Sequence, residues 1–204
     1  PGLGNELPYA VDTLPETLEA EPNDAAAQQL TLPVIVNGQV IRPGDVDRFR
    51  FTGRAGEEIV AEVLARRLDS PLDSLLQLTG PAGEAVAAND DQDDPAAGLT
   101  THQADSVLRA KLPADGTYEL ALSDVQHQGG EACAYRLRVS PPRPDFVLRA
   151  TPAGLALSPG RSGTVAVQAI RRDGFTGDID LTLAENTGGF KAAAAKIAGD
   201  KDTA

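Results

Sequence analysis

The sequence has no tryptophan and no methionine, and it has few residues of the types that most often carry catalysis. Its 204 residues include one cysteine and two histidines, so no disulfide can form within the chain. Neither His102 nor His127 has a partner in the His-x-x-x-His spacing of a zinc helix, and no Gly-x-Ser-x-Gly nucleophile elbow occurs. The sequence does not exclude a Ser-His-Asp triad, because such a triad is recognised by its geometry and not by residue spacing. We therefore expect that the chain is not an enzyme.

Long apolar runs and excess positive charge are also missing. No apolar run approaches the roughly 18 residues of a membrane helix, so we expect no membrane insertion. The formal net charge is -12: residues 1–140 carry 10 Lys/Arg against 23 Asp/Glu (-13), and residues 141–204 carry 8 against 7 (+1). An acidic first part argues against nucleic acid, whose binders need a basic patch, and fits cations as partners. The contrast predicts two domains of different character.

Short segments with a period of two residues fill the first part of the chain. In "GTYELAL", Tyr118, Leu120 and Leu122 alternate with Glu119 and Ala121, which is typical of a half-buried strand. About nine such segments, separated by turn-forming Gly, Pro and Asp, predict an all-β fold, an antiparallel jelly-roll-like β-sandwich. The only helical candidate is "NDAAAQQL", which Asn23 or Asp24 would cap.

Proline-rich stretches suggest the domain boundaries. Residues 1–18 are predicted to be a linker or docking strand, residues 19–140 the β-sandwich domain, and residues 141–204 a second domain after the joint "SPPRPDF". Three strand patterns follow that joint, as at the start of an immunoglobulin-like sandwich. Such a sandwich needs ~100 residues, so we expect an incomplete one. Because the chain begins at Pro1 without a signal peptide, we interpret it as a piece of a longer protein.

Oxygen-bearing side chains gather just before the first strand pattern. Four of them fall within "EAEPND", and two more stand at the entrance of the "DRFRF" strand, where alternation directs both to one face. Calcium takes 6–8 oxygen ligands, so carboxylates from the two segments are candidates for one calcium site. The candidate ligands are Glu19, Glu21, Asn23, Asp24, Asp45 and Asp47.

The same residues have plainer explanations. The acidic segment is equally typical of a solvated linker, Asp24 of a helix cap and Asp45 of a turn. A second acidic run, Asp90–Asp94, lacks the Gly and the Glu of an EF-hand loop at their required positions. We interpret it as a solvated loop, with a weak second cation site as the alternative.

Four motifs in order, "EAEPND", "GDVDRF", "GTYELALSD" and "YRLRVS", resemble the bacterial pre-peptidase C-terminal domain, a family that includes the collagen-binding domains of clostridial collagenases. The resemblance covers residues 19–140. It implies a jelly-roll β-sandwich, no catalysis by the module, and in some members a calcium ion. In the collagenase modules the acidic segment and the later Asp pair form this site together. Glu19, Glu21, Asn23, Asp24 and Asp45 match it, and Asp47 matches the motif with a less certain role.

Two functions of different class follow. The first is a non-catalytic accessory or structural module of a larger exported multidomain protein, stabilised by calcium at its N-terminal linker. Its partners would be neighbouring domains of the same chain. The alternative is a polymer-binding module that targets an attached hydrolase to collagen or polysaccharide, although few aromatic residues are present to form a binding platform. Either function implies a secreted, periplasmic or cell-surface location.

Overall fold

The computed structural model describes residues 8–93, 102–184 and 189–204. The chain divides into two compact units, Pro1–Pro142 and Arg143–Ala204, and each is described by itself. Within the described residues the single helical element is a 3-10 turn, η1 (Arg66–Leu68), and everything else that is regular is β-strand. No described helix has the length and apolarity needed to cross a membrane. The prediction of an all-β fold is confirmed.

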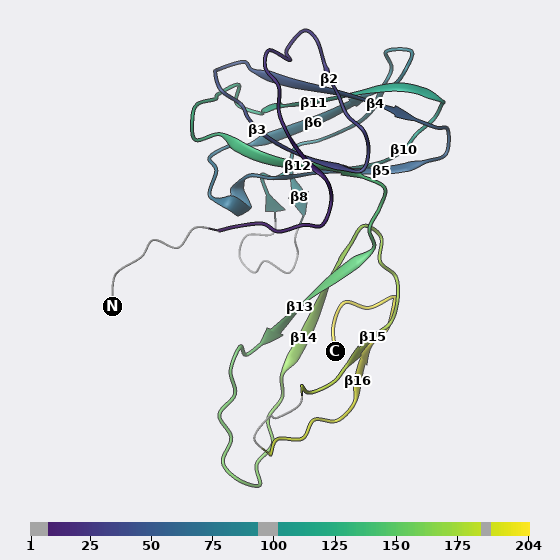
Figure 1. Ribbon diagram of the computed structural model, residues 1–204. Helices are drawn as coiled ribbons and strands as arrows, with labels where there is room; N and C mark the ends of the chain where they lie inside the picture. Colours follow the sequence, from purple (N-terminus) through teal and green to yellow (C-terminus); the bar gives the residue numbers. More distant parts are fainter. Residues whose placement is uncertain (1–7, 94–101, 185–188) are drawn as a thin grey trace. The chain divides into compact units, whose positions relative to one another are not determined.

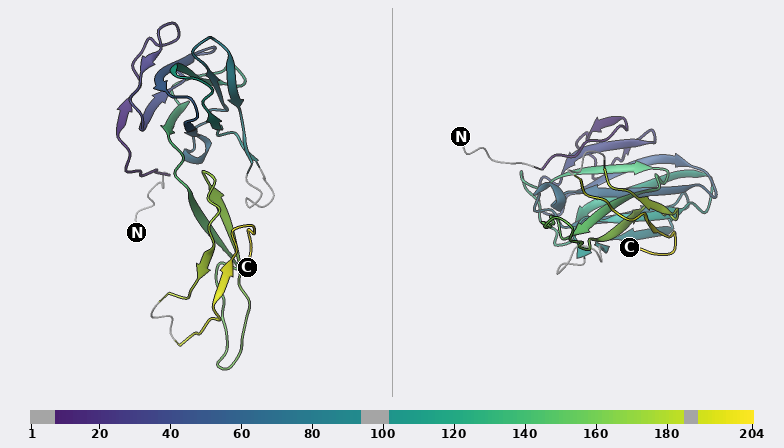
Figure 2. Two further views of the ribbon diagram at one scale, coloured as in Figure 1. Left: turned by 90° about the vertical axis from the view of Figure 1, so that its right-hand side faces the viewer. Right: turned by 90° about the horizontal axis from the view of Figure 1, so that it is seen from below.

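The first unit is a sandwich of two five-stranded sheets (Figures 1 and 2). Sheet A has the order β1-β3-β12-β5-β10, and sheet B has the order β2-β4-β11-β6-β7. The strands of sheet A are β1 (Glu16–Leu18), β3 (Val34–Gln39), β12 (Ala134–Ser140), β5 (Glu58–Leu64) and β10 (Val107–Lys111). The strands of sheet B are β2 (Gln28–Gln29), β4 (Val46–Gly53), β11 (Gly116–Asp124), β6 (Ser74–Thr79) and β7 (Ala85–Asn89).

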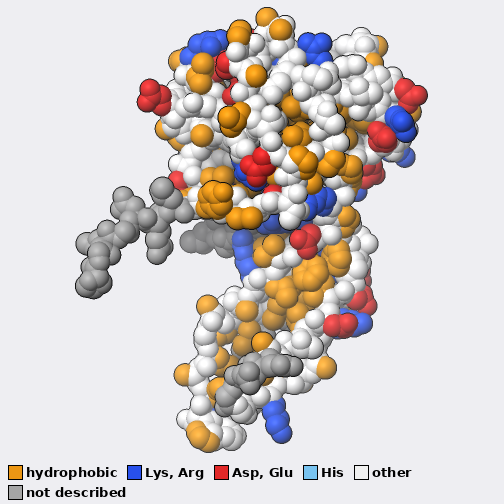
Figure 3. All heavy atoms as spheres, viewed as in Figure 1, with side chains coloured by type: hydrophobic (Ala, Val, Ile, Leu, Met, Phe, Trp, Pro, Cys, Tyr) orange, Lys and Arg blue, Asp and Glu red, His pale blue; other side chains and the backbone are white. Residues whose placement is uncertain are grey.

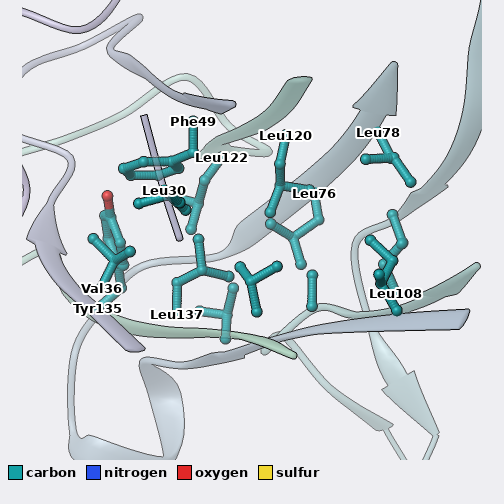
Figure 4. Packing of buried hydrophobic residues seen from close by; sticks show 14 of the residues in the cluster. Leu30, Val36, Phe49, Leu76, Leu78, Leu108, Leu120, Leu122, Tyr135 and Leu137 are labelled. Atoms are coloured by element: carbon teal, nitrogen blue, oxygen red, sulfur yellow. The ribbon is translucent and has the colours of Figure 1, made fainter. Parts of the chain in front are cut away.

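The core lies between the two sheets, and the alternation in the sequence explains which side chains fill it. Every second residue of β4, β11 and β12 points inward and is buried. Figure 4 shows Val36 and Leu137 of sheet A facing Phe49 and Leu122 of sheet B. Because each fully buried side chain of this kind contributes about 1.5–3 kcal/mol, these contacts hold the sheets together.

The core also contains a tyrosine hydroxyl group and a cysteine thiol, and each has an environment that suits it. The rings of Phe51 and Tyr118 stack with 5.7 Å between their centroids. The Tyr118 hydroxyl donates to the Ala114 carbonyl oxygen at 2.7 Å, so its burial leaves no polar atom without a partner. Cys133 is a buried free thiol, as expected for a small apolar residue in this position.

The N-terminal segment contains two short strands. Residues 16–18, which lie in the segment interpreted above as a linker or docking strand, form β1 and pair in parallel with β3 at the edge of sheet A. The predicted helix in "NDAAAQQL" is wrong, because Asp24–Ala26 form bends and Gln28–Gln29 pair in parallel with β4. The Gln28 side chain accepts a hydrogen bond from the Ala20 N–H and donates one to the Leu18 carbonyl oxygen. These bonds favour the observed extended segment, whereas a helix this short would be only marginally stable.

The second unit is also built of β-strands, in two separate antiparallel pairs. The pairs are β13 (Asp145–Thr151) with β14 (Ala166–Arg172), and β15 (Ile179–Leu181) with β16 (Ala195–Ile197). Its buried core consists of Ala169, Ile179 and Ile197. On the face shown in Figure 3, hydrophobic side chains gather over β13 and β14. An immunoglobulin-like topology for this unit stays a prediction.

The burial pattern of β6 predicts that two neighbouring substitutions will differ greatly in their effect on the stability of the first unit. Leu76 is fully buried between the sheets and Gln77 points outward. Leu76→Ala should lower the free energy of unfolding of the first unit by about 2–5 kcal/mol, because a cavity replaces the side chain. Gln77→Ala, the control, should change it by less than about 0.5 kcal/mol.

Denaturant unfolding followed by tyrosine fluorescence measures this difference. All three tyrosines, Tyr9, Tyr118 and Tyr135, belong to the first unit, so the signal reports on that unit alone. Equal effects of the two substitutions would contradict the assigned faces of β6.

Candidate metal centre

Strand β1 fixes the position of the acidic segment that follows it. The pairing of β1 with β3 continues one step further, where the Glu19 N–H donates to the Asn37 carbonyl oxygen at 3.0 Å. The Glu16 carboxylate forms a two-pronged ion pair with the Arg136 guanidinium of β12, at 2.6 and 2.8 Å. This ion pair is a clamp that ties β1 to β12 across the intervening strand β3.

The Glu19 carboxylate is held by three donors. One oxygen, Oε2, accepts the Gln39 N–H at 2.8 Å, and the other, Oε1, accepts the Asn23 side-chain amide at 2.8 Å. The Tyr135 hydroxyl also donates to Oε1, at 3.2 Å. The Glu19 carboxylate is therefore fixed in one place by donors from β3, β12 and its own segment.

Gly38 makes room for this arrangement. A Cβ atom at position 38 would lie 2.4 Å from the Tyr135 hydroxyl oxygen and 2.6 Å from Glu19 Oε2. Both distances are far below van der Waals contact. Any other residue at this position would push apart the carboxylate and the hydroxyl, so the glycine is required for their close approach.

Asp47 enters the same region from the opposite sheet. It is the second residue of β4, and alternation places it on the inward face with Phe49 and Phe51. Its side chain is fully buried, and neither carboxylate oxygen has a hydrogen-bond partner. Burial, together with the nearby Glu19 carboxylate, raises the pKa of Asp47 to about 9. An uncompensated carboxylate here is costly to the fold.

Three carboxylates converge at this point. Glu19, Glu21 and Asp47 each offer an oxygen, and these oxygens lie within 4.8 Å of one another. Because the distance between two oxygens bound to one calcium is similar, the group has the dimensions of a cation site. Within the described part of the chain, it is the one group of three acidic or metal-binding side chains with this geometry.

Two further predicted ligands border the three carboxylates. Asn23 and Asp45 are buried, and each has one side-chain oxygen, Oδ1, without a hydrogen-bond partner. The other Asp45 oxygen accepts the Ile41 N–H at 2.6 Å. Burial raises the pKa values of Asp45 and Glu21, and the charge of Asp45 adds to the increase at Glu21. Together with both oxygens of Asp47, four buried oxygens in this region lack a hydrogen-bond partner, although Asp45 Oδ1 lies 3.4 Å from Arg42 Nη2 in an ion pair.

Asp24, which the motif placed among the candidate ligands, does not belong to the group of three carboxylates. Its carboxylate pairs with the Arg42 guanidinium and accepts the Val46 N–H at 3.2 Å. The Val46 hydrogen bond is the main reason why the pKa of Asp24 lies below its usual value. Both Asp24 oxygens thus have partners outside the three carboxylates, and a direct role for Asp24 in binding a cation stays a prediction.

The sequence analysis missed the contributions of Gly38 and Tyr135. Tyr135 lies 116 residues from Glu19 along the chain, and its position in an alternating strand marked it only as a core residue. The only feature of the sequence that could have indicated a polar role for Tyr135 is its hydroxyl group, carried at an inward position of the strand. The second acidic run, Asp90–Asp94, extends beyond residue 93, where the first described range ends. The weak cation site considered there stays a prediction.

Comparison with known proteins relates the chain to part of a subtilase-type serine protease. No family model matches the chain. Over 111 residues it is 40% identical to a probable subtilase-type serine protease of Deinococcus radiodurans, and the match covers 50% of this chain and 14% of that protein. The chain therefore corresponds to a small part of this relative.

Two solved structures are similar to the first unit. One is the pre-peptidase C-terminal domain of a collagenase from Bacillus anthracis, with 20% identity, a TM-score of 0.39, and coverage of 59% of this chain and 99% of that one. The other is a periplasmic inhibitor of g-type lysozyme from Aeromonas hydrophila, with 16% identity, a TM-score of 0.41, and coverage of 61% and 97%. By sequence, the chain is related to a region of a subtilase-type serine protease.

The clamp on β1 predicts an unusual titration for Glu16. Hydrogen bonds from Arg136, and then from Asn37, lower the pKa of Glu16 from its usual 4.5 to about 2. Because the pKa is lower in the folded protein, the stabilisation is fully present above about pH 4.5 and is lost as the pH falls through about 2. Arg136→Gln should return the pKa of Glu16 toward 4.5 and loosen β1.

Side-chain carboxyl NMR across this pH range measures the titration directly. Arg109→Gln is the matched control, because it removes a similar exposed ion pair, with Glu58, from the opposite edge of sheet A. A Glu16 carboxyl that titrates near 4.5 in the natural chain would contradict the clamp.

Proposed function

We propose that the first unit is a non-catalytic accessory module of a larger exported protease, and that it binds one calcium ion through Glu19, Glu21 and Asp47. The observation that carries the calcium assignment is the set of four buried oxygens without hydrogen-bond partners, all in residues of the two acidic motifs. Buried polar atoms are almost always paired in folded proteins, so a concentration of unpaired oxygens points to a missing cation.

The donor set suits calcium better than other common metals. All the candidate groups are oxygens, and neither histidine nor cysteine is among them, which disfavours zinc and copper. Three carboxylates with the Oδ1 atoms of Asn23 and Asp45 supply at least five oxygens. Backbone carbonyls or water would complete the 6–8 ligands that calcium takes. Magnesium demands a tight octahedron and retains its water, so it should bind much more weakly.

The ion would hold two parts of the sandwich together. Glu19 and Glu21 follow β1 of sheet A, whereas Asp47 belongs to β4 of sheet B. Bound calcium would neutralise the mutual repulsion of these carboxylates and link the N-terminal segment to the start of β4. The unfolded chain has no such site, so the binding free energy adds to the stability of the folded unit.

The accessory role rests on the sequence relationship to part of a subtilase-type protease. Export, to the periplasm, the cell surface or the medium, follows from the same relationship, and the neighbouring domains of the parent chain are the expected partners. Polymer binding is less well supported. Among the five aromatic residues of the first unit, Phe49, Phe51, Tyr118 and Tyr135 are buried and Tyr9 alone is exposed, so no aromatic platform is formed.

Thermal unfolding tests the calcium assignment. Calcium at ~100 times its dissociation constant should add ~2.7 kcal/mol to the folded state, and this should raise the Tm by roughly 5–15 °C over the value in EDTA. Magnesium should do much less. Asp47→Asn, which keeps the shape of the side chain, should abolish the calcium shift and raise the Tm in EDTA, because it removes a buried carboxyl group.

Two variants serve as controls. Asp24→Asn should lower the Tm equally with and without calcium, since Asp24 contacts Arg42 and Val46 instead of the three carboxylates. The double variant Asp90→Asn/Asp91→Asn should retain the full calcium shift. An unchanged Tm of the natural chain in millimolar calcium would contradict the calcium assignment. A calcium-dependent Tm shift that is lost only in the double variant would instead assign the site to the second acidic run.

A further inference from the structure

A groove of about 770 Å³ lies on the outer face of sheet A, within the first unit. Its floor consists of outward-pointing residues of adjacent strands, among them Gln39 of β3, Ala134 of β12 and Leu64 of β5. Pro8–Ala10 and Leu18 of β1 line one side, and Leu68–Ser70, at η1, line the other. Figure 1 shows both segments at the same end of the first unit. The volume falls in the range of sites that hold a small ligand or a few residues of a peptide.

Apolar side chains line this groove and are left uncovered. Tyr9 is 88% exposed, Leu18 74% and Ile41 44%, although all three are large hydrophobic residues. Scattered exposed apolar residues are ordinary on a protein surface, but these three line one concave region together with Leu64 and Leu68. The groove therefore offers apolar contacts to a ligand that can enter it.

The charge of the groove is negative. Glu21, Asp69 and Glu131 are exposed and line it, and Glu19 is partly exposed. The one cation among its lining residues is Arg136, whose guanidinium is already neutralised by the two-pronged pair with Glu16. Within the described residues, Asp69 and Glu131 form no ion pair through their carboxylates. The groove thus combines uncovered apolar side chains with carboxylates that lack cationic partners.

We propose that this groove binds a peptide segment in which Lys or Arg alternates with apolar side chains. The basic residues would face Asp69 and Glu131, and the apolar ones would cover Tyr9, Leu18 and Ile41. Alternation suits an extended peptide lying along the outer face of a sheet, because successive side chains then point to opposite sides. Asp69 and Glu131 are not among the proposed calcium ligands, so the groove stays acidic whether or not a metal is bound.

Fluorescence anisotropy with a labelled peptide of sequence Gly-Leu-Lys-Leu-Lys-Leu-Gly tests the proposal. The natural chain should bind this probe in EDTA and in calcium. It should bind a version with Glu in place of Lys, or with Ser in place of Leu, at least about tenfold more weakly. Asp69→Asn/Glu131→Gln should weaken binding by about tenfold, as the loss of two exposed ion pairs implies. Leu18→Ser should weaken it as well.

The control is Asp90→Asn/Asp91→Asn, which changes the net charge by the same amount outside the groove and should leave binding unchanged. Equal losses in the two double variants would show that the probe responds only to the overall negative charge, and would overturn the proposal. Undiminished binding of the Ser-containing peptide would overturn the apolar part of the argument. No binding of the original probe at millimolar concentration would overturn the whole proposal.

Discussion

The burial of one carboxyl group, that of Asp47, constrains the whole N-terminal half of the first unit. The period of β4 places it on the inward face, the same face as Phe49, and neither of its oxygens has a hydrogen-bond partner. Such a group is expensive unless a partner compensates it. The surrounding structure brings further oxygens instead of donors to Asp47: β1 carries Glu19 to it, and Gly38 leaves space for this approach. A cation is the partner that we propose for this arrangement.

The fold could be predicted from the sequence because its strands alternate so regularly. Inward positions such as Leu120 and Leu137 are buried as the pattern requires, since a one-residue slip would expose a whole strand face. The parallel edge strands β1 and β2 could not be predicted, because two or three residues are too few to show a period. The helix predicted after Asn23 does not form. The helix propensity of three alanines is overridden by hydrogen bonds of the Asn23 and Gln28 side chains to the preceding segment.

The candidate site was predictable only in part, for a related reason. Motif spacing identified Glu19, Glu21 and Asp47, whose oxygens the fold brings within 4.8 Å. Spacing could not separate Asp24 from them, since the contacts of Asp24 depend on Arg42, 18 residues away. Nor could it assign a polar role to Tyr135, which the same pattern marks as core.

The central claim is that a cation belongs between Glu19, Glu21 and Asp47, and locating the ion by diffraction tests it most directly. Terbium resembles calcium in its preference for oxygen ligands and scatters anomalously. Crystals soaked in terbium should show one strong anomalous peak within about 2.3–2.6 Å of oxygens from these three residues, and the peak should vanish in Asp47→Asn crystals. A peak confined to Asp90–Asp94, or no peak at this position in the natural protein, would contradict the account.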